Sequence, residues 1–481
     1  MSEAKKKDLT FVHLAVIVVL MFFFKYLPAP APITPYGMAI IGIFLGIIYG
    51  WSTSGLIWPS LLALVAVSLT EYGGFMQITV AALGNNNLYL LVIGMLAFDA
   101  LNQADLSKYI LFKLLSSKAV KGKPYLLLVA LLMASCIVGF ITGGVVVLLI
   151  LWPIFTELFK MLGYEKGDKF VAMLLTGVAV VGNLPNCAML PFYGFPILIT
   201  GTLAASTGVM VQNAPWIINV FLIVVVFNLL WPLIMKVCGA DFDKLKNADF
   251  TVYEKTLEGG LNKRQKLILG AAVLTLSIIV VLAFMPATSP LYALYNQVGV
   301  GGLLSALLAF YLLFKVDDKP LLDIRVSAGN FYWDLFFLNA VAVFVSGLVT
   351  SEATGISAFF IMKLSPILGT MGPWMFILVV CAISLIATNF LNNMAVLMVM
   401  LNVVAIFYNS GMPFNIELLA VLLTTFAVSG IVTPAASIYG AMVHAHEYST
   451  PTSTYTAGII VSVFLFAIAV AITFPLSMFI Y

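Results

Sequence analysis

Residues 121–160 of the 481-residue chain read KGKPYLLLVALLMASCIVGFITGGVVVLLILWPIFTELFK. Between Lys123 and Glu157 there is no charged residue, so the run is apolar enough for a membrane interior. A continuous helix of this length would extend well beyond a hydrocarbon core of roughly 30 Å, since each residue adds about 1.5 Å. Lysines stand at both ends, and basic residues favour the cytoplasmic side. Residues 124–156 are therefore predicted to form a re-entrant hairpin that enters the membrane from the cytoplasm and returns.

The composition agrees with a membrane location for the whole chain. Hydrophobic residues make up 62% of it and charged residues 9%, whereas globular domains carry about 25% charged residues. Long uncharged apolar runs recur from end to end. These features exclude a soluble enzyme and a nucleic-acid binder, and continuous runs without alternation exclude a β-barrel porin. The four cysteines lack the spacing of a metal site, so no metal or organic cofactor is predicted from them.

The apolar runs predict eleven membrane crossings and a second hairpin. The second hairpin, residues 365–408, has almost no basic flank and is predicted to enter from the outside. The predicted crossings are 9–27, 35–51, 54–70, 85–102, two within 170–235, 267–286, 295–314, 331–350, 418–442 and 453–479. Of the 23 basic residues, only Lys25 and Lys363 then lie outside. The N-terminus is predicted to be cytoplasmic and the C-terminus to be outside.

After the first helix, the same order of features occurs twice: three spans, a hairpin, a broken span and a closing span. The breaks are Gly182–Pro196 (GNLPNCAMLPFYGFP) and Gly430–Ser437 (GIVTPAAS). Each unit crosses five times, and an odd number of crossings inverts the second copy. The predicted fold is an all-α polytopic membrane protein with two inverted repeats, two re-entrant hairpins and two broken helices. This combination is typical of alternating-access transporters that bind substrate near the midplane.

The repeats divide the chain into scaffold and transport parts. Residues 1–123 are predicted to hold the anchor helix and scaffold helices, and residues 124–212 the first hairpin and broken helix of the transport part. Residues 213–364 hold the closing helix, a cytoplasmic linker and the second-repeat scaffold. Residues 365–481 supply the second hairpin, the second broken helix and the last helix of the transport part.

Neither hairpin and neither broken helix contains Lys, Arg, Asp or Glu. A bound anion would therefore be held by hydroxyls, amides and the N-termini of half-helices, which carry a partial positive charge. Carbonyls exposed at the breaks, together with Thr388, Asn393 and Thr433, offer the oxygen ligands that a sodium ion prefers. Structural roles compete with this interpretation, because Gly139 and Gly143 form a GxxxG packing motif and interhelical hydrogen bonds would also explain Asn392 and Asn393.

A few ionisable groups fall near the apolar runs. Asp99, in the fourth span, is interpreted as a cap near the cytoplasmic face, with a proton site as the alternative. His444, His446 and Glu447 are interpreted as interfacial residues at the end of the second broken helix, with proton coupling as the alternative.

The order of hairpins and breaks, with the triplets near the hairpin tips, resembles the divalent anion/sodium symporter family of the ion transporter superfamily. The two Ser-Asn-Thr tips of that family fall on Thr142-Gly143-Gly144 and on Asn392-Asn393-Met394, of which Asn393 is identical. The Thr-Pro-Pro-Asn element falls on Thr433-Pro434-Ala435-Ala436, and its first-repeat counterpart on Asn183-Leu184-Pro185-Asn186. The resemblance implies a homodimer with a fixed scaffold and an elevator-like transport domain that moves dicarboxylates or related anions with sodium.

Residue roles follow from the repeat architecture and this resemblance together. The predicted substrate-binding residues are Thr142, Gly143, Gly144, Asn186, Asn392, Asn393, Thr433 and Pro434. The predicted sodium-binding residues are Thr388, Asn393, Gly430 and Gly182. Because Gly143 and Gly144 have no side chains, sodium is expected to be held mainly by the second repeat.

The sequence therefore predicts a multi-pass transporter of the cell membrane that is a secondary active symporter of small organic anions such as di- or tricarboxylates. Sodium is the expected coupling ion, and no other cofactor is expected. The expected partners are the organic anion, membrane lipid and a second copy of the chain, with no nucleic acid. A proton-coupled or exchange transporter of another small solute is the alternative. An intramembrane enzyme is disfavoured because no GxSG, HExxH or paired-aspartate motif lies in a span, and a channel because the two hairpins enter from opposite sides.

Overall fold

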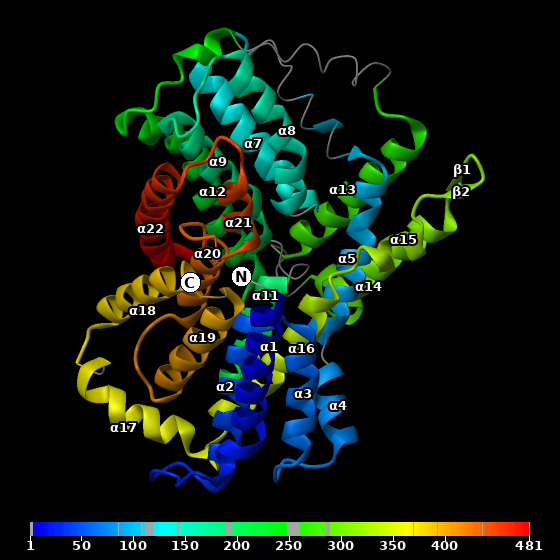
Figure 1. Cartoon of the computed structure of the whole chain (residues 1–481). Helices are drawn as coiled ribbons and strands as arrows, with labels where there is room; N and C mark the ends of the chain where they lie inside the picture. The colour runs from blue at the N-terminus through cyan, green and yellow to red at the C-terminus, as the bar shows by residue number, and fades with distance from the viewer. Residues whose placement is uncertain are drawn as a thin grey trace.

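The computed structural model is a bundle of helices with one two-stranded hairpin (Figure 1). It describes residues 3–84, 86–106, 109–110, 113, 119–142, 144–188, 194–247, 260–283, 289–368, 370–391, 393–434 and 436–480. Two buried apolar clusters hold the bundle together. The larger one surrounds both hairpins and both broken helices, and the smaller one joins α5 (Asn86–Gln103) to α13 (Lys263–Ala283) and α14 (Pro290–Leu313).

The N-terminal part contains the four predicted spans and one additional short helix. The first span is α1 (Glu3–Val18), which continues through the π-helical turn η1 (Val19–Phe23) and the 3-10 turn η2 (Phe24–Tyr26). α2 (Pro35–Thr53) and α3 (Ile57–Ser68) follow. α4 (Phe75–Leu83) was not predicted, because its apolar run is too short to suggest a span. It precedes α5, and the two are bent by 50° relative to each other.

The first hairpin consists of α7 (Pro124–Thr142) and α8 (Gly144–Met161), which pack side by side (Figure 1). The apolar run of 33 residues is thus two helices, as its length required. α7 ends at Thr142 and α8 begins at Gly144, and residue 143 lies outside the described residues.

The first broken helix comprises α9 (Lys169–Asn183), the single turn α10 (Pro185–Ala188) and α11 (Gly194–Thr207). The closing helix α12 (Asn213–Val237) follows, and the 3-10 turn η3 (Asp243–Asn247) begins the linker. Residues 170–187, which make up nearly all of α9 and α10, are buried within the protein, which explains why their sequence is apolar on every side.

The second repeat opens with α13 and α14, followed by β1 (Lys315–Val316), β2 (Lys319–Pro320), the short α15 (Ile324–Gly329) and α16 (Trp333–Thr350). The predicted span 295–314 was expected to be a continuous helix, but α14 is broken at Gly299. Gly299 has φ +66° and ψ 173°, a conformation that side-chain-bearing residues rarely adopt.

The second transport segment has the same order as the first. The 3-10 turn η5 (Glu352–Thr354) and α17 (Ile356–Leu368) lead to the hairpin α18 (Pro373–Thr388) and α19 (Asn393–Asn409). The hairpin begins at Pro373, eight residues later than predicted, because α17 occupies the start of the apolar run. The broken helix α20 (Ile416–Ala427) and α21 (Ile438–Ala445) follows, and α22 (Pro451–Ile480) closes the chain.

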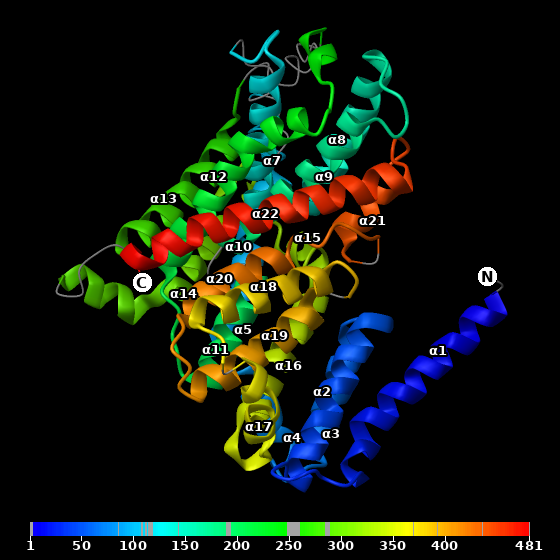
Figure 2. The same cartoon turned by 90° about the vertical axis from the view of Figure 1, so that its left-hand side faces the viewer.

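Several contacts between helices of the two repeats occur in reciprocal pairs: each of these contacts has a counterpart in which the roles of the first and second repeat are exchanged. α11, the second half of the first broken helix, packs on α19 of the second hairpin, and α21 packs reciprocally on α8 of the first. α9 packs on α22, and α20 packs on α12. The closing helices α12 and α22 pack against each other (Figure 2). This reciprocity is what two interlocked copies of one motif produce.

Membrane spans can be judged by helix length and composition. Among the described residues, six helices are long and apolar enough to cross a membrane, or seven if the bent pair α4–α5 is one span. The six include α8, which belongs to the first hairpin, so the predicted eleven crossings also require shorter apolar helices such as α1, α3 and α20. Half-helices are expected to be short because they end near the membrane centre.

The topology can be tested by cysteine labelling. Lys121→Cys and Lys166→Cys lie on the two exposed flanks of the first hairpin, and both should react with a membrane-impermeant thiol reagent only from the cytoplasmic side. The background should lack the partly exposed Cys136 and Cys238. Labelling of the two positions from opposite sides would make the hairpin a single crossing and would contradict the inverted repeat.

Candidate functional site

The second hairpin tip and the second helix break meet in the protein interior. α18 ends at Thr388, which is completely buried, and α19 begins at Asn393, whose exposed fraction is 8%. The Thr388 hydroxyl donates to Asn393 Oδ1 at 2.9 Å and lies 3.4 Å from the carbonyl of Ala427, the last residue of α20. One hydroxyl thus contacts both the hairpin tip and the end of the broken helix.

Gly430 completes this cluster by its lack of a side chain. A Cβ atom at residue 430 would lie 2.7 Å from the Thr388 carbonyl oxygen and 2.8 Å from Asn393 Oδ1. Both distances are too short for a carbon atom, so only glycine permits the approach. Three of the four residues predicted to bind sodium, Thr388, Asn393 and Gly430, are therefore adjacent. We refer to them with Ala427 as the second half-site.

The unwound segment after Gly430 is bonded to Asn389, a residue that was not predicted. Asn389 Oδ1 accepts hydrogen bonds from the backbone N–H groups of Ile431 and Val432, both at 2.9 Å. The Thr433 hydroxyl donates to the Asn389 carbonyl at 2.6 Å. A sequence signal was present, because Asn389 stands close before the predicted residues Asn392 and Asn393 in a largely apolar hairpin.

Thr433 and Pro434, both predicted to bind substrate, are the next two residues of this unwound segment. Thr433 is half-buried with its proton directed at Asn389, and Pro434 is exposed. The segment ends at Ser437, whose hydroxyl donates to the Gly430 carbonyl at 2.5 Å and caps α21 by accepting from Gly440 N at 3.0 Å.

The first helix break has a related but more compact arrangement. Gly182 lies against both helices of the first hairpin: a Cβ atom on Gly139 would overlap the Gly182 carbonyl, and one on Gly144 would lie 3.0 Å from it. Gly182 therefore lies against the first hairpin, but its own Cβ atom would have room, since the nearest atoms belong to Val147 at 3.4 Å. Tyr439 of α21 also reaches this tip, since its Cε1 would lie 2.8 Å from a Cβ atom on Gly144.

Three predicted positions at the tips cannot be placed further. Gly143 and Asn392 lie outside the described residues, and for Thr142 the structure describes the backbone, which ends α7, but not the side chain.

Asn183 and Asn186 connect the two repeats. Asn183 Nδ2 donates to the Val428 carbonyl at 2.7 Å, and Asn186 Nδ2 donates to Asn183 Oδ1 at 3.0 Å. Asn186 is completely buried, and its Oδ1 has no hydrogen-bond partner in the structure. The last carbonyls of α20, which have no partner within their own helix, thus receive side chains from the first break and from the second hairpin.

The second half-site consists of neutral oxygens. Among the described residues, Asp99 is the only buried carboxylate, and no buried lysine or arginine occurs. No group of three or more His, Cys, Asp or Glu side chains in this part of the chain is arranged to hold a metal ion. Positive charge at the second half-site therefore comes from the N-terminus of α19 rather than from a side chain.

Asp99 has a structural environment. Its carboxylate accepts from Gln103 Nε2 and the Ser327 hydroxyl, each at 2.8 Å, and from Asn330 Nδ2 at 3.4 Å. These bonds join α5 to α15. Asp99 was predicted to cap its helix. Its carboxylate instead attaches α15, the short helix before α16, to α5.

The histidines at the end of α21 are more enclosed than predicted. His446 is buried with its ring against Trp152 and Phe159 of α8, and this burial lowers its pKa and favours the neutral imidazole. His444 Nε2 lies 2.9 Å from the Val432 carbonyl. His446 is thus packed within the protein, while the neighbouring Glu447 is exposed.

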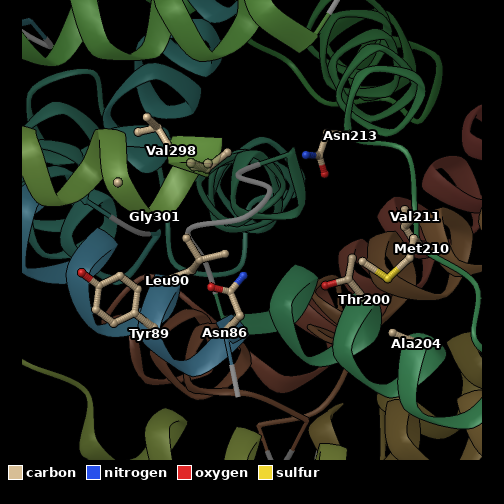
Figure 3. A pocket seen from close by; sticks show the side chains of 13 residues that line it. Asn86, Tyr89, Leu90, Thr200, Ala204, Met210, Val211, Asn213, Val298 and Gly301 are labelled. Carbon is tan, nitrogen blue, oxygen red and sulfur yellow. The ribbon is translucent and has the colours of Figure 1, made fainter. Parts of the chain in front are cut away.

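A cavity of about 420 Å³ lies between the two predicted parts of the protein. Asn86 and Tyr89 of α5, Thr200 of α11 and Asn213 of α12 approach it from different sides (Figure 3). The break of α14, residues 298–302, forms a further wall. Backbone that is not fully bonded within a helix is tolerated at membrane depth where it lines such a cavity.

Two hairpins, two breaks and a buried oxygen cluster define a membrane transporter built from interlocked repeats. Residues 7–479 match the family model of the sodium:sulfate symporter transmembrane region. The match covers almost the whole chain, and the protein belongs to this family. At the level of class it is a sodium-coupled anion symporter, in agreement with the predicted divalent anion/sodium symporter resemblance. No curated protein sequence matches the chain.

The close approach at Gly430 can be tested by adding one methyl group. Gly430→Ala should displace the Thr388 carbonyl or Asn393, and overpacking of this kind costs about 1–3 kcal/mol. We expect a roughly tenfold or greater loss of uptake rate per folded protein. Gly270→Ala in α13 is the matched control, because no atom lies within 4 Å of its added methyl group. Equal activity of the two variants would show that the second half-site tolerates expansion.

Proposed function

We propose that the protein imports or exports small organic anions, such as di- or tricarboxylates, together with sodium ions that bind at the second half-site. The observation that carries this proposal is the buried contact of Thr388, Asn393 and Gly430. It brings a hydroxyl, an amide oxygen and backbone carbonyls together without a fixed charge. Family membership supports sodium as the coupling ion and an anion as the substrate.

Sodium binding requires that oxygen lone pairs converge on one point. The Thr388 carbonyl and Asn393 Oδ1 already lie on the same side, since both would contact a methyl group on Gly430. The Thr388 hydroxyl donates to Asn393 in this structure, but it also lies 3.4 Å from the Ala427 carbonyl. Donation to Ala427 alone would leave a hydroxyl lone pair and Asn393 Oδ1 available for the ion. Hard cations prefer such oxygen ligands.

The anion is proposed to bind beside the sodium ion, at the N-terminus of α19. The first turn of a helix directs backbone N–H groups outward and carries a partial positive charge. The Asn393 amide has its oxygen on the Thr388 side, so its Nδ2 group points away from the sodium ligands and suits a carboxylate. The Thr433 proton is already used by Asn389. We therefore assign Thr433 to the support of the unwound segment rather than to direct substrate contact.

An elevator mechanism and a homodimer remain part of the proposal. The predicted scaffold helices α5 and α14 line the cavity of about 420 Å³ together with α11 and α12, while α11 also packs closely on the scaffold helix α16. A boundary of this kind suits a transport part that moves against a scaffold. Asn86, Thr200 and Asn213 would give an anion polar contacts along the boundary without trapping it.

The alternative is proton coupling or exchange of another small solute. His444, against the unwound backbone, is the ionisable group that the structure places nearest to the second break by a direct contact. Uptake into proteoliposomes, with labelled mono-, di- and tricarboxylates and with sulfate, separates these functions when sodium and proton gradients are imposed separately. We expect a di- or tricarboxylate to accumulate with an inward sodium gradient. Accumulation of sulfate alone would correct the substrate, and accumulation driven only by a pH gradient would contradict sodium coupling.

The sodium ligands can be tested with a change that preserves shape. Thr388→Val removes one hydroxyl ligand and should abolish sodium dependence at the sodium concentrations that drive wild-type uptake, since the loss of a polar contact to a charged group costs about 1.5–3 kcal/mol. Thr176→Val is the matched control: Thr176 is also completely buried, and its hydroxyl bonds only to carbonyls of its own helix α9. Thr142→Val should change sodium dependence little, because the first repeat contributes few side-chain oxygens. Retained sodium dependence in Thr388→Val would contradict the proposed site.

A further inference from the structure

The unwound segment between α20 and α21 has backbone N–H groups that find no hydrogen-bond partner within the segment itself. Where a helix is interrupted, the following N–H groups lose their carbonyl partners, and the protein interior supplies no bulk water to replace them. Ile431, which is buried, and Val432 are the first residues after Gly430. Asn389 accepts both of their N–H groups on one oxygen.

Asn389 also fixes its own orientation. Its Nδ2 group donates to the Leu385 carbonyl at 2.8 Å, so the amide is held within the last turn of α18. The exposed fraction of Asn389 is 3%. The Thr433 hydroxyl, donating to the Asn389 backbone carbonyl, adds a third bond between the same two segments. The hairpin tip and the unwound segment are thereby connected at three consecutive residues.

The position of this connection matters because Asn389 directly follows Thr388, and Ile431 directly follows Gly430. The bonds of Asn389 to Ile431 and Val432 therefore determine how closely Gly430 approaches the Thr388 carbonyl and Asn393 Oδ1. We propose that Asn389 is the positioning residue of the second half-site: it sets the affinity for sodium without contacting the ion, by holding the unwound segment against the hairpin tip. This inference rests on the proposed function of the half-site.

Asn389→Ala tests the proposal through the concentration dependence on sodium. We expect the sodium concentration for half-maximal uptake to rise about tenfold to a hundredfold, as for the loss of two buried hydrogen bonds. The maximal rate per folded protein at saturating sodium should change much less. A variant that only folded poorly would show the reverse, a lower amount of active protein with an unchanged half-maximal concentration.

Asn402→Ala is the matched control. Asn402 lies in the same hairpin, has an exposed fraction of 3%, and donates to the Ser346 hydroxyl and the Met398 carbonyl, away from the break. It should leave the half-maximal sodium concentration unchanged. Equal shifts in Asn389→Ala and Asn402→Ala, or no shift in Asn389→Ala, would overturn the proposal.

Asn389→Asp provides a rescue with a distinct signature. A protonated carboxyl group has the shape of the amide and can both accept from Ile431 and Val432 and donate to Leu385, whereas an ionised one loses the donor. Sodium affinity of Asn389→Asp should therefore approach that of the wild type as the pH is lowered, relative to the pH profile of the wild type. A pH profile identical to that of Asn389→Ala would contradict the hydrogen-bonding role.

Hydrogen exchange of the backbone amides in residues 428–437 measures the contact of Asn389 with Ile431 and Val432, and it requires no assumption about the coupling ion. Exchange should accelerate in Asn389→Ala and not in Asn402→Ala. Faster exchange with an unchanged half-maximal sodium concentration would show that the contact exists but does not set affinity, and would refute the proposal. If the wild type proves indifferent to sodium, the proposed function fails. The positioning role is then judged by the substrate KM, which must rise in Asn389→Ala and stay constant in Asn402→Ala.

Discussion

The structure depends on how interrupted backbone is satisfied away from water. Each broken helix leaves N–H and carbonyl groups without partners within the helix. Each group left unpaired in an apolar interior costs on the order of several kcal/mol of folding free energy. Asparagines from both repeats supply the missing partners at the second break. Asn389 receives the N–H groups after Gly430, and Asn183 donates to the carbonyl of Val428 just before it. The same bonds connect hairpin to break and repeat to repeat, so the transport part is joined as one unit.

Glycines at the hairpins and breaks allow backbone and side-chain oxygen atoms to approach one another where a Cβ atom would prevent it. Gly182 lies against Gly139 and Gly144 in the first repeat, and Gly430 lies against Thr388 and Asn393 in the second. The two arrangements correspond, but their chemistry differs. The first brings backbone against backbone, whereas the second adds a hydroxyl and an amide. Two repeats with the same order of hairpin and break therefore support an asymmetric pair of proposed ion sites, in which the second repeat provides the side-chain ligands.

The sequence was sufficient for features governed by length and charge. The interruption of residues 124–156, the two breaks and the order of helices follow from the thickness of a bilayer and the position of lysines, and helices appear where these rules require them. Features governed by contacts between distant segments were not predictable. α14 reads as one apolar run, and its break at Gly299, which lines the cavity, was not predicted. Asn389 was missed because its partners, Ile431 and Val432, lie more than 40 residues away. Thr388, Asn393 and Gly430 were found because the repeat pattern aligned the hairpin tip with the break.

The central claim is that the second hairpin tip and the second break form one sodium site. The most direct measurement is a pair of high-resolution cryo-electron microscopy maps of the protein, one in sodium and one in choline. A density enclosed by the hydroxyl and carbonyl oxygens of Thr388 and by Asn393 Oδ1, present in sodium and absent in choline, is the predicted result. Maps that are identical at this position, or a sodium-dependent density only at another place such as the Asp99 carboxylate, would contradict it.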